Sequence, residues 1–177
     1  MSPLLLTALL LTQVPDESGP ALALDLDYET AYAARQGDVA AERGETIAGV
    51  GTVWLAWSGW RIGAEARVAT IANDPVGLAV GDAHPFIADF IALVDYRFWI
   101  DRFAIAPQLG GGTEIFAGGR GAAGWIVELG VEGTFRINDI WSVHVRFAFS
   151  PTTGVQTPFA PQAYWRFVGG VEWTSPI

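Results

Sequence analysis

Ser142 and His144 are the pair of side chains whose types could support nucleophilic or acid–base chemistry. They stand two positions apart, so both lie on one face of an extended strand, with Arg146 next along that face. A general base must reach its nucleophile by a hydrogen bond and must itself be oriented by a third group. The order and surroundings of Ser142 and His144 match no deacylase motif. We therefore interpret His144 as a structural residue and predict no catalytic residue.

Metal and cofactor chemistry have little support in the sequence. The chain has two His and no Cys, which excludes the usual zinc ligand sets. Asn73-Asp74 and Gly81-Asp82 offer oxygen atoms but lack the spacing of a calcium loop. The acidic segment 25–29 is better explained as one face of a strand, and the glycine runs at 110–112 and 118–121 match no phosphate-binding loop. We predict no metal site and no cofactor.

The overall composition excludes two classes of protein. The net charge is −9, which disfavours nucleic acid as a partner, because phosphate binding needs a basic patch. Apolar residues make up 51% of the chain, yet no run reaches the ~18 residues of a membrane helix. Its 21 Gly, 10 Pro and 8 Trp suit short strands, tight turns and aromatic residues at an interface.

Apolar and polar residues alternate along several segments, which is the pattern of a β-strand with two different faces. The clearest runs are 125–137 and 141–149, and the turn former Asn138-Asp139-Ile140 between them predicts an antiparallel hairpin. Pro107 would mark a bulge. The orientation of 46–57 stays open because both of its faces are apolar or small. In total we predict eight strands, over residues 22–32, 46–57, 60–69, 86–97, 102–115, 125–137, 141–149 and 162–173.

The connections between these segments alternate in length. The short connections are 58–59, 98–101 and 138–140, and the longer ones, rich in Gly, Pro and Asp, are 34–45, 72–85, 116–123 and 150–161. Short turns at one end and longer loops at the other are typical of an up-and-down transmembrane β-barrel. With an even number of strands, both termini fall at the short-turn end.

The charged face of each strand is predicted to point into the barrel. The interior of an eight-stranded barrel is just wide enough to be filled by side chains, and buried charges need partners. Inward glycines such as Gly63, Gly110, Gly112, Gly130 and Gly170 could leave water-filled gaps, which keeps a narrow pore as an alternative. The predicted interior charge network consists of Glu65, Arg67, Asp95, Arg97, Glu114, Glu128, Glu132, Arg136, His144, Arg146, Arg166 and Glu172.

Tryptophan placement favours a membrane barrel over a soluble one, in which the apolar face would point inward. Most of the Trp residues fall near the short turns, and Trp125 and Trp165 fall near the other end. Two aromatic rims predict two membrane interfaces, and closure gives every backbone polar group a partner inside lipid. The predicted interface aromatics are Trp57, Trp60, Trp99, Trp125, Trp141, Trp165 and Trp173.

In strand pattern, loop pattern and aromatic rims, residues 22–174 resemble the small eight-stranded outer-membrane barrels of the OmpA/OmpX-like class. The last strand, with Trp165, Phe167, Val171 and Trp173, resembles the C-terminal assembly signal of such barrels, although Thr174 to Ile177 follow it. The resemblance implies a location in the outer membrane of a Gram-negative bacterium. It also implies contact with outer-membrane lipid and lipopolysaccharide, and insertion by the barrel assembly machinery.

The expected function is that of a non-enzymatic monomer with a structural role or a surface-interaction role. A narrow pore for small solutes or ions is the first alternative. The second is a lipid A-modifying enzyme that uses His144, because some barrels of similar size carry a His, a Ser and a carboxylate. A soluble periplasmic barrel is the rival at the level of the fold. The sequence does not specify a partner for the loops.

Residues 1–21 are predicted to lie outside the barrel. Met1 to Thr12 form an apolar stretch of the length found in the core of a signal peptide. The segment 13–20 is rich in turn formers and acidic residues, as a flexible linker is. We therefore expect residues 1–21 to be a signal peptide with a linker.

Overall fold

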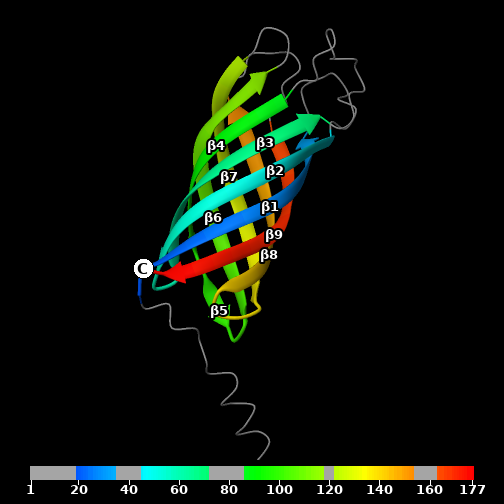
Figure 1. The fold of residues 1–177 in the computed structure, drawn as a ribbon. Helices are drawn as coiled ribbons and strands as arrows, with labels where there is room; N and C mark the ends of the chain where they lie inside the picture. The colour runs from blue at the N-terminus through cyan, green and yellow to red at the C-terminus, as the bar shows by residue number, and fades with distance from the viewer. Residues whose placement is uncertain (1–18, 35–44, 72–85, 118–121, 154–162) are drawn as a thin grey trace, which may run out of the picture.

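The computed structural model describes residues 19–34, 45–71, 86–117, 122–153 and 163–177, which form a closed antiparallel β-barrel (Figure 1). The strands are β1 (Ala21–Ala34), β2 (Glu45–Trp57), β3 (Trp60–Ile71), β4 (Phe86–Tyr96), β5 (Phe98–Ile100), β6 (Phe103–Ala117), β7 (Ala122–Arg136), β8 (Trp141–Thr153) and β9 (Ala163–Pro176). Neighbours in the chain pair with each other except β4 and β5, which both pair with β6, and β1 pairs with β9 to close the sheet. None of the described residues forms a helix long and apolar enough to span a membrane.

β4 and β5 are two parts of one barrel strand, so the barrel has the eight strands predicted. Both parts pair with β6 in one continuous register. The pairing is interrupted opposite Pro107, which has no amide hydrogen to donate. The amide of Arg97 donates instead to the carbonyl of Gly59, at 2.8 Å. The predicted bulge at Pro107 is therefore wrong, because the register is the same on both sides of the interruption.

Several strands extend further than predicted. The turn expected at 98–101 is wrong, because Phe98–Ile100 forms β5 and the turn narrows to Asp101-Arg102. The loops expected at 116–123 and 150–161 are also shorter, because β6 and β8 run further and β7 begins earlier. The added residues are mostly Ala, Thr and Pro, whose side chains give little contrast between two faces. The remaining parts of the longer connections lie outside the described residues.

The short connections and both described chain ends lie at one end of the barrel, here called the turn-side end; the opposite end is the loop-side end (Figure 1). Ser58 and Gly59 have positive φ angles of 49° and 84°, as a two-residue type I′ hairpin requires. Between β7 and β8, the Asn138 side chain accepts hydrogen bonds from the amides of Ile140 and Trp141, at 2.9 Å and 2.8 Å. Local turn chemistry therefore fixes which strands are neighbours at this end.

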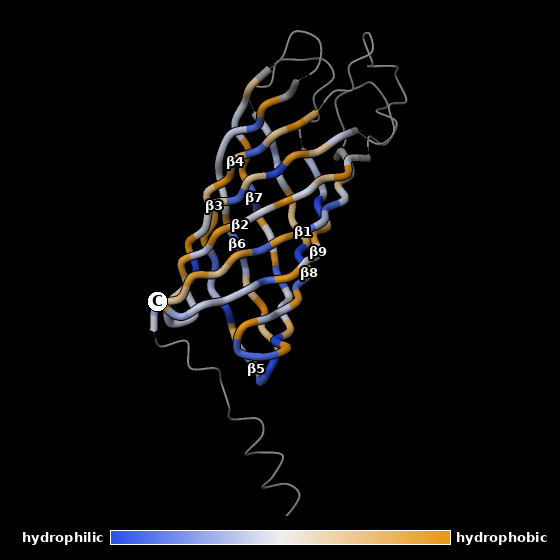
Figure 2. Tube along the Cα trace, in the orientation of Figure 1, coloured by the Kyte–Doolittle hydropathy of each residue, from blue (hydrophilic) through white to orange (hydrophobic). Residues whose placement is uncertain are grey.

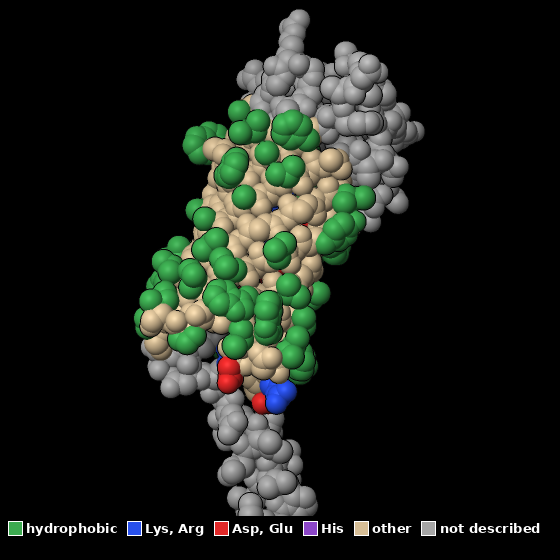
Figure 3. All heavy atoms as spheres, viewed as in Figure 1, with side chains coloured by type: hydrophobic (Ala, Val, Ile, Leu, Met, Phe, Trp, Pro, Cys, Tyr) green, Lys and Arg blue, Asp and Glu red, His purple; other side chains and the backbone are tan. Residues whose placement is uncertain are grey.

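The barrel is polar inside and apolar outside. Leu26 is 73% exposed and Val145 is 68% exposed, whereas Glu29 and Arg166 on the same sheet are completely buried. Figure 2 shows hydrophobic and hydrophilic positions alternating along the strands. On the face drawn in Figure 3, apolar side chains predominate and charged ones gather at the turn-side end. This polarity is the reverse of that of a soluble barrel.

The orientation of β2, left open by the sequence, follows from Trp54. Its side chain is buried in the barrel, whereas Val53 and Leu55 point outward. Gly63 on β3 is its direct partner, and a Cβ atom there would lie less than 3.0 Å from the Trp54 ring. The glycine therefore makes the room that the indole occupies.

Replacing Gly63 by Ala should lower the free energy of unfolding by about 1–3 kcal/mol, because the added methyl group overpacks the interior against Trp54. Gly49→Ala on β2 is the matched control, since no atom lies within 4 Å of its Cβ position. Urea titrations of the two variants measure the difference. Equal effects of both substitutions would contradict the inward position of Trp54.

Candidate functional site: the charged barrel interior

Among the described residues, the interior holds ten buried carboxylates and five buried guanidiniums. They form two groups along the barrel axis. The loop-side cluster is built around Arg67, Arg146 and Arg166, and the turn-side cluster around Arg61 and Arg97. The buried carboxylates are those of Asp25, Asp27, Glu29, Glu65, Asp89, Asp95, Glu114, Glu128, Glu132 and Glu172.

Arg166 on β9 lies at the centre of the loop-side cluster. Its Nε and Nη2 donate to Glu29 and Glu65, each at 2.8 Å, and its Nη1 donates to Glu128. Arg67 shares Glu29 through its Nε, at 2.6 Å. One guanidinium thus joins carboxylates from β1, β3 and β7, which are not neighbours of one another in the sheet.

The remaining contacts of the loop-side cluster extend it across the barrel. Arg146 on β8 donates to Glu65 and, at 3.2 Å, to the side-chain oxygen of Gln108 on β6. Arg67 donates through Nη1 to Asp89 on β4, at 2.8 Å. Glu29 and Glu65 each accept hydrogen bonds from two arginines, so the buried guanidiniums and carboxylates pair with one another. Such pairing is needed because an unpaired charge is costly in a low-dielectric interior.

The turn-side cluster is centred on Arg61 of β3. Its guanidinium binds Asp95 through two hydrogen bonds of 2.9 Å and 2.5 Å, and it reaches Glu132 and Glu172 at 2.8 Å each. Arg97 binds the same two glutamates, with 3.2 Å between its Nη2 and Glu132 and 2.9 Å between its Nη1 and Glu172. Two arginines therefore share two glutamates from β7 and β9.

Trp54 is an interior residue that the sequence analysis missed. Its indole nitrogen donates to Asp25 at 2.5 Å, and the guanidinium carbon of Arg61 lies 4.2 Å from its ring centroid, in cation–π range. On β8, His144 Nε2 lies 2.9 Å from Asp27 of β1. The sequence gives one signal for this inward position: Trp54 is two residues from Thr52, so both lie on the more polar face of β2.

Eleven of the twelve residues predicted for the interior network are buried. Arg136 is half-buried at the turn-side end of β7, where its guanidinium carbon lies 4.4 Å from the ring centroid of Trp99. Glu114 is buried, but neither of its carboxylate oxygens has a hydrogen-bond partner. The predicted residues thus share one interior, but they do not form a single continuous network.

Trp99, one of the predicted interface aromatics, lies beside two arginines at the turn-side end. It is half-buried, with Arg136 at 4.4 Å and Arg97 at 5.6 Å from its ring. Two cations beside the ring favour this half-buried position. Of the other predicted interface aromatics, Trp173 is half-buried and the exposed ones are Trp57, Trp60, Trp125, Trp141 and Trp165.

The interior does not present a Ser–His pair for catalysis. Ser142 and His144 are both buried, so a substrate would have to enter the barrel to reach them. His144 Nε2 faces Asp27, and its Nδ1 has no hydrogen-bond partner among the described residues, so this nitrogen does not contact the Ser142 hydroxyl.

At four of the five inward glycines named above, the space that a side chain would take is already occupied. A Cβ atom at Gly63, Gly110, Gly112 or Gly170 would lie less than 3.0 Å from existing atoms of the barrel. The space beside each of these glycines is therefore already filled.

Two solved structures are similar to this chain in fold. Neisserial surface protein A has a TM-score of 0.56 and 11% identity, over 88% of this chain and 97% of that one. Ail, the attachment invasion locus protein of Yersinia pestis, in complex with the heparin analogue sucrose octasulfate, has a TM-score of 0.50 and 10% identity. That match covers 89% of this chain and 99% of Ail. No protein-family profile and no curated protein matches the sequence. The chain thus has the fold of the small eight-stranded barrels of the OmpA/OmpX-like class.

Replacing Arg166 by Met should lower the free energy of unfolding by about 3–5 kcal/mol, because three buried glutamates lose a shared cation. Arg102→Met is the control, since Arg102 is exposed at the turn-side end and its loss should change stability by less than about 0.5 kcal/mol. Denaturant titration measures both. A similar small effect for both variants would mean that the loop-side cluster does not hold the barrel together.

Proposed function

We propose that this protein is an integral β-barrel of a bacterial outer membrane with a closed interior, and that it acts in envelope structure or surface interaction. The observation that carries the proposal is the reversed polarity of the barrel. Ten carboxylates are buried inside, while long apolar side chains cover the outside.

The apolar exterior supports a lipid environment. Leu26, Ile105, Leu129 and Val145 are each more than half exposed, and they belong to four different strands. Continuous apolar surfaces of this kind are rare on soluble monomers. In lipid, the same surface is favourable, and the closed sheet leaves no strand edge without hydrogen bonds.

The ion-paired interior supports a plugged barrel rather than a pore. The two clusters join strands on opposite sides of the interior, and the inward glycines are packed against other atoms. A role at the cell surface is supported by the two structures of similar fold, which are described as a surface protein and as an attachment and invasion protein. The catalytic alternative at His144 lacks support because both Ser142 and His144 are buried.

Membrane fractionation of the expressing bacterium should place the protein in the outer membrane. On SDS gels, unboiled and boiled samples should migrate differently, because a closed barrel resists SDS until it is heated. The purified protein should give no channels in planar bilayers. Recovery in the soluble fraction with no heat-dependent shift would contradict the membrane proposal, and discrete single channels would instead favour the narrow pore.

A charge placed on the middle of the outer face should be costly only if that face contacts lipid. Leu129 lies at the centre of β7 and is 53% exposed, so Leu129→Arg should lower stability in lipid vesicles by about 2–4 kcal/mol. Ile140→Arg, in the exposed turn between β7 and β8, should change it by about 0–1 kcal/mol. Equal effects measured by urea titration would argue that the exterior faces water.

A further inference from the structure

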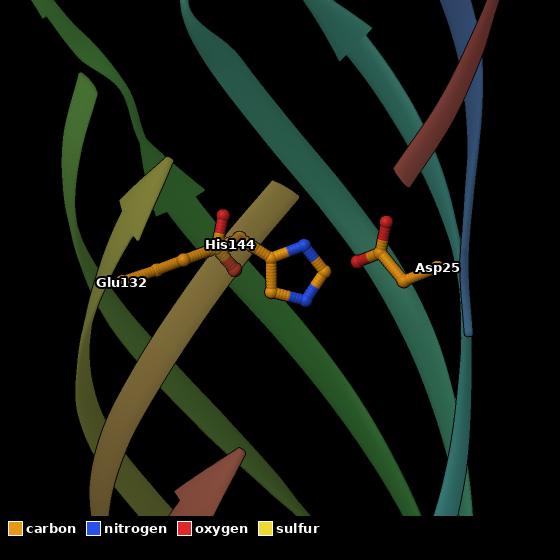
Figure 4. A group of neighbouring side chains, drawn as sticks. All are labelled: Asp25, Glu132 and His144. Carbon is orange, nitrogen blue, oxygen red and sulfur yellow. The ribbon is translucent and has the colours of Figure 1, made fainter. Parts of the chain in front are cut away.

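Three potential metal ligands converge inside the turn-side half of the barrel. Asp25 on β1, Glu132 on β7 and His144 on β8 each offer one ligand atom, and these atoms lie within 4.8 Å of one another. Figure 4 shows the imidazole of His144 between the two carboxylates, with its nitrogens on the side that faces Asp25. β7 and β8 pair with each other, whereas β1 comes near them only through the β1–β9 pairing that closes the barrel.

Two of the three residues carry buried atoms that the protein leaves without a partner. His144 is 5% exposed and its Nδ1 has no hydrogen-bond partner, and Asp25 is 6% exposed and its Oδ1 has none. The other atoms of these groups are engaged, since Asp25 Oδ2 accepts from Trp54 and His144 Nε2 faces Asp27. Buried polar atoms are rarely left in this state, so their convergence points to a ligand.

Glu132, the third potential ligand, is held in position through one of its carboxylate oxygens. Arg61, Arg97 and Thr134 all donate to its Oε1, at 2.8 Å, 3.2 Å and 2.9 Å. These contacts hold the carboxylate in place, and one of its oxygens lies within 4.8 Å of ligand atoms of Asp25 and His144.

The charges around these ligands favour a divalent cation. The turn-side half buries five carboxylates, those of Asp25, Asp27, Asp95, Glu132 and Glu172, against the two guanidiniums of Arg61 and Arg97. Even with a positive charge on His144, two negative charges remain without a buried counter-charge among the described residues. Unbalanced charge in a low-dielectric interior is costly, and one divalent cation would balance it.

We propose that Asp25, Glu132 and His144 form a binding site for one divalent transition-metal ion, of which Zn²⁺ is the best match. One imidazole nitrogen with two carboxylate oxygens suits Zn²⁺, whereas Mg²⁺ and Ca²⁺ prefer oxygen ligands alone. The sequence analysis predicted no metal site, because it searched for ligands at short spacing along the chain. These three ligands come from three separate strands.

Asp27 acts as a positioning residue for this site. Its Oδ1 lies 2.9 Å from His144 Nε2, an ion-pair contact that orients the ring, while His144 Nδ1 has no hydrogen-bond partner among the described residues. A carboxylate behind a ligating histidine is a common arrangement in metalloproteins, and it fixes both the tautomer and the orientation of the ring.

Cobalt(II) titration of the refolded protein in detergent tests the site directly. Visible absorption bands of bound Co²⁺ should saturate at one ion per chain, and one equivalent of Zn²⁺ should remove them, whereas excess Mg²⁺ should not. Because the ligands are buried, the titration is repeated with Co²⁺ present during refolding. The absence of these bands under both conditions would overturn the proposal.

Variants then identify the ligands. His144→Gln and Asp25→Asn should each abolish binding at one ion per chain, and Asp27→Asn should weaken it by about 10–100-fold. His84→Gln removes the other histidine of the chain and should bind as the wild type does. Undiminished binding by folded Asp25→Asn, or loss of binding in His84→Gln, would place the metal elsewhere. If His144→Gln does not fold, Asp25→Asn decides alone.

Discussion

The buried guanidinium–carboxylate contacts are the interaction on which the rest of the structure depends. Five arginines lie in an interior that buries ten carboxylates, and each of them binds at least two different acidic side chains. The contacts join strands that are not neighbours in the sheet, such as β3 with β9 and with β7. The barrel wall supplies the hydrogen bonds of the backbone, and the arginines supply the cross-links that fill its interior.

This arrangement reverses the usual source of stability in a small domain. A soluble protein of this size gains stability by burying apolar side chains, whereas this one buries charges and exposes Leu, Val, Ile and Phe. Ion pairs replace an apolar core only at the cost of desolvating both partners, so every unpaired group is expensive. Lipid around the barrel would restore the hydrophobic contribution to stability, because the apolar exterior would then be removed from water.

The strands and their two faces could be predicted from the sequence because alternation reports directly on a pleated sheet. Their alternate positions along the strands placed Glu128, Glu132 and Arg166 on the inward face, and all three are buried in the structure. Their partners could not be predicted, because an ion pair depends on register and on barrel closure between segments far apart in the chain. Trp54 was missed for a related reason: its inward position depends on Gly63 of the next strand. The arginines beside Trp99 could not be predicted either, because proximity to a turn says nothing about the cations near a ring.

The pairing of the first strand with the last has a consequence for the order of assembly. β1 meets β9 along its whole length, from Ala21 with Pro176 to Ala34 with Ala163. Until the final residues of the chain are available, β1 has one neighbour and one open edge, and the interior charges cannot all meet. Contacts of such long sequence separation form late and slowly. A chain without β9 would therefore be unable to close, because the described pairings offer β1 no other strand in place of β9.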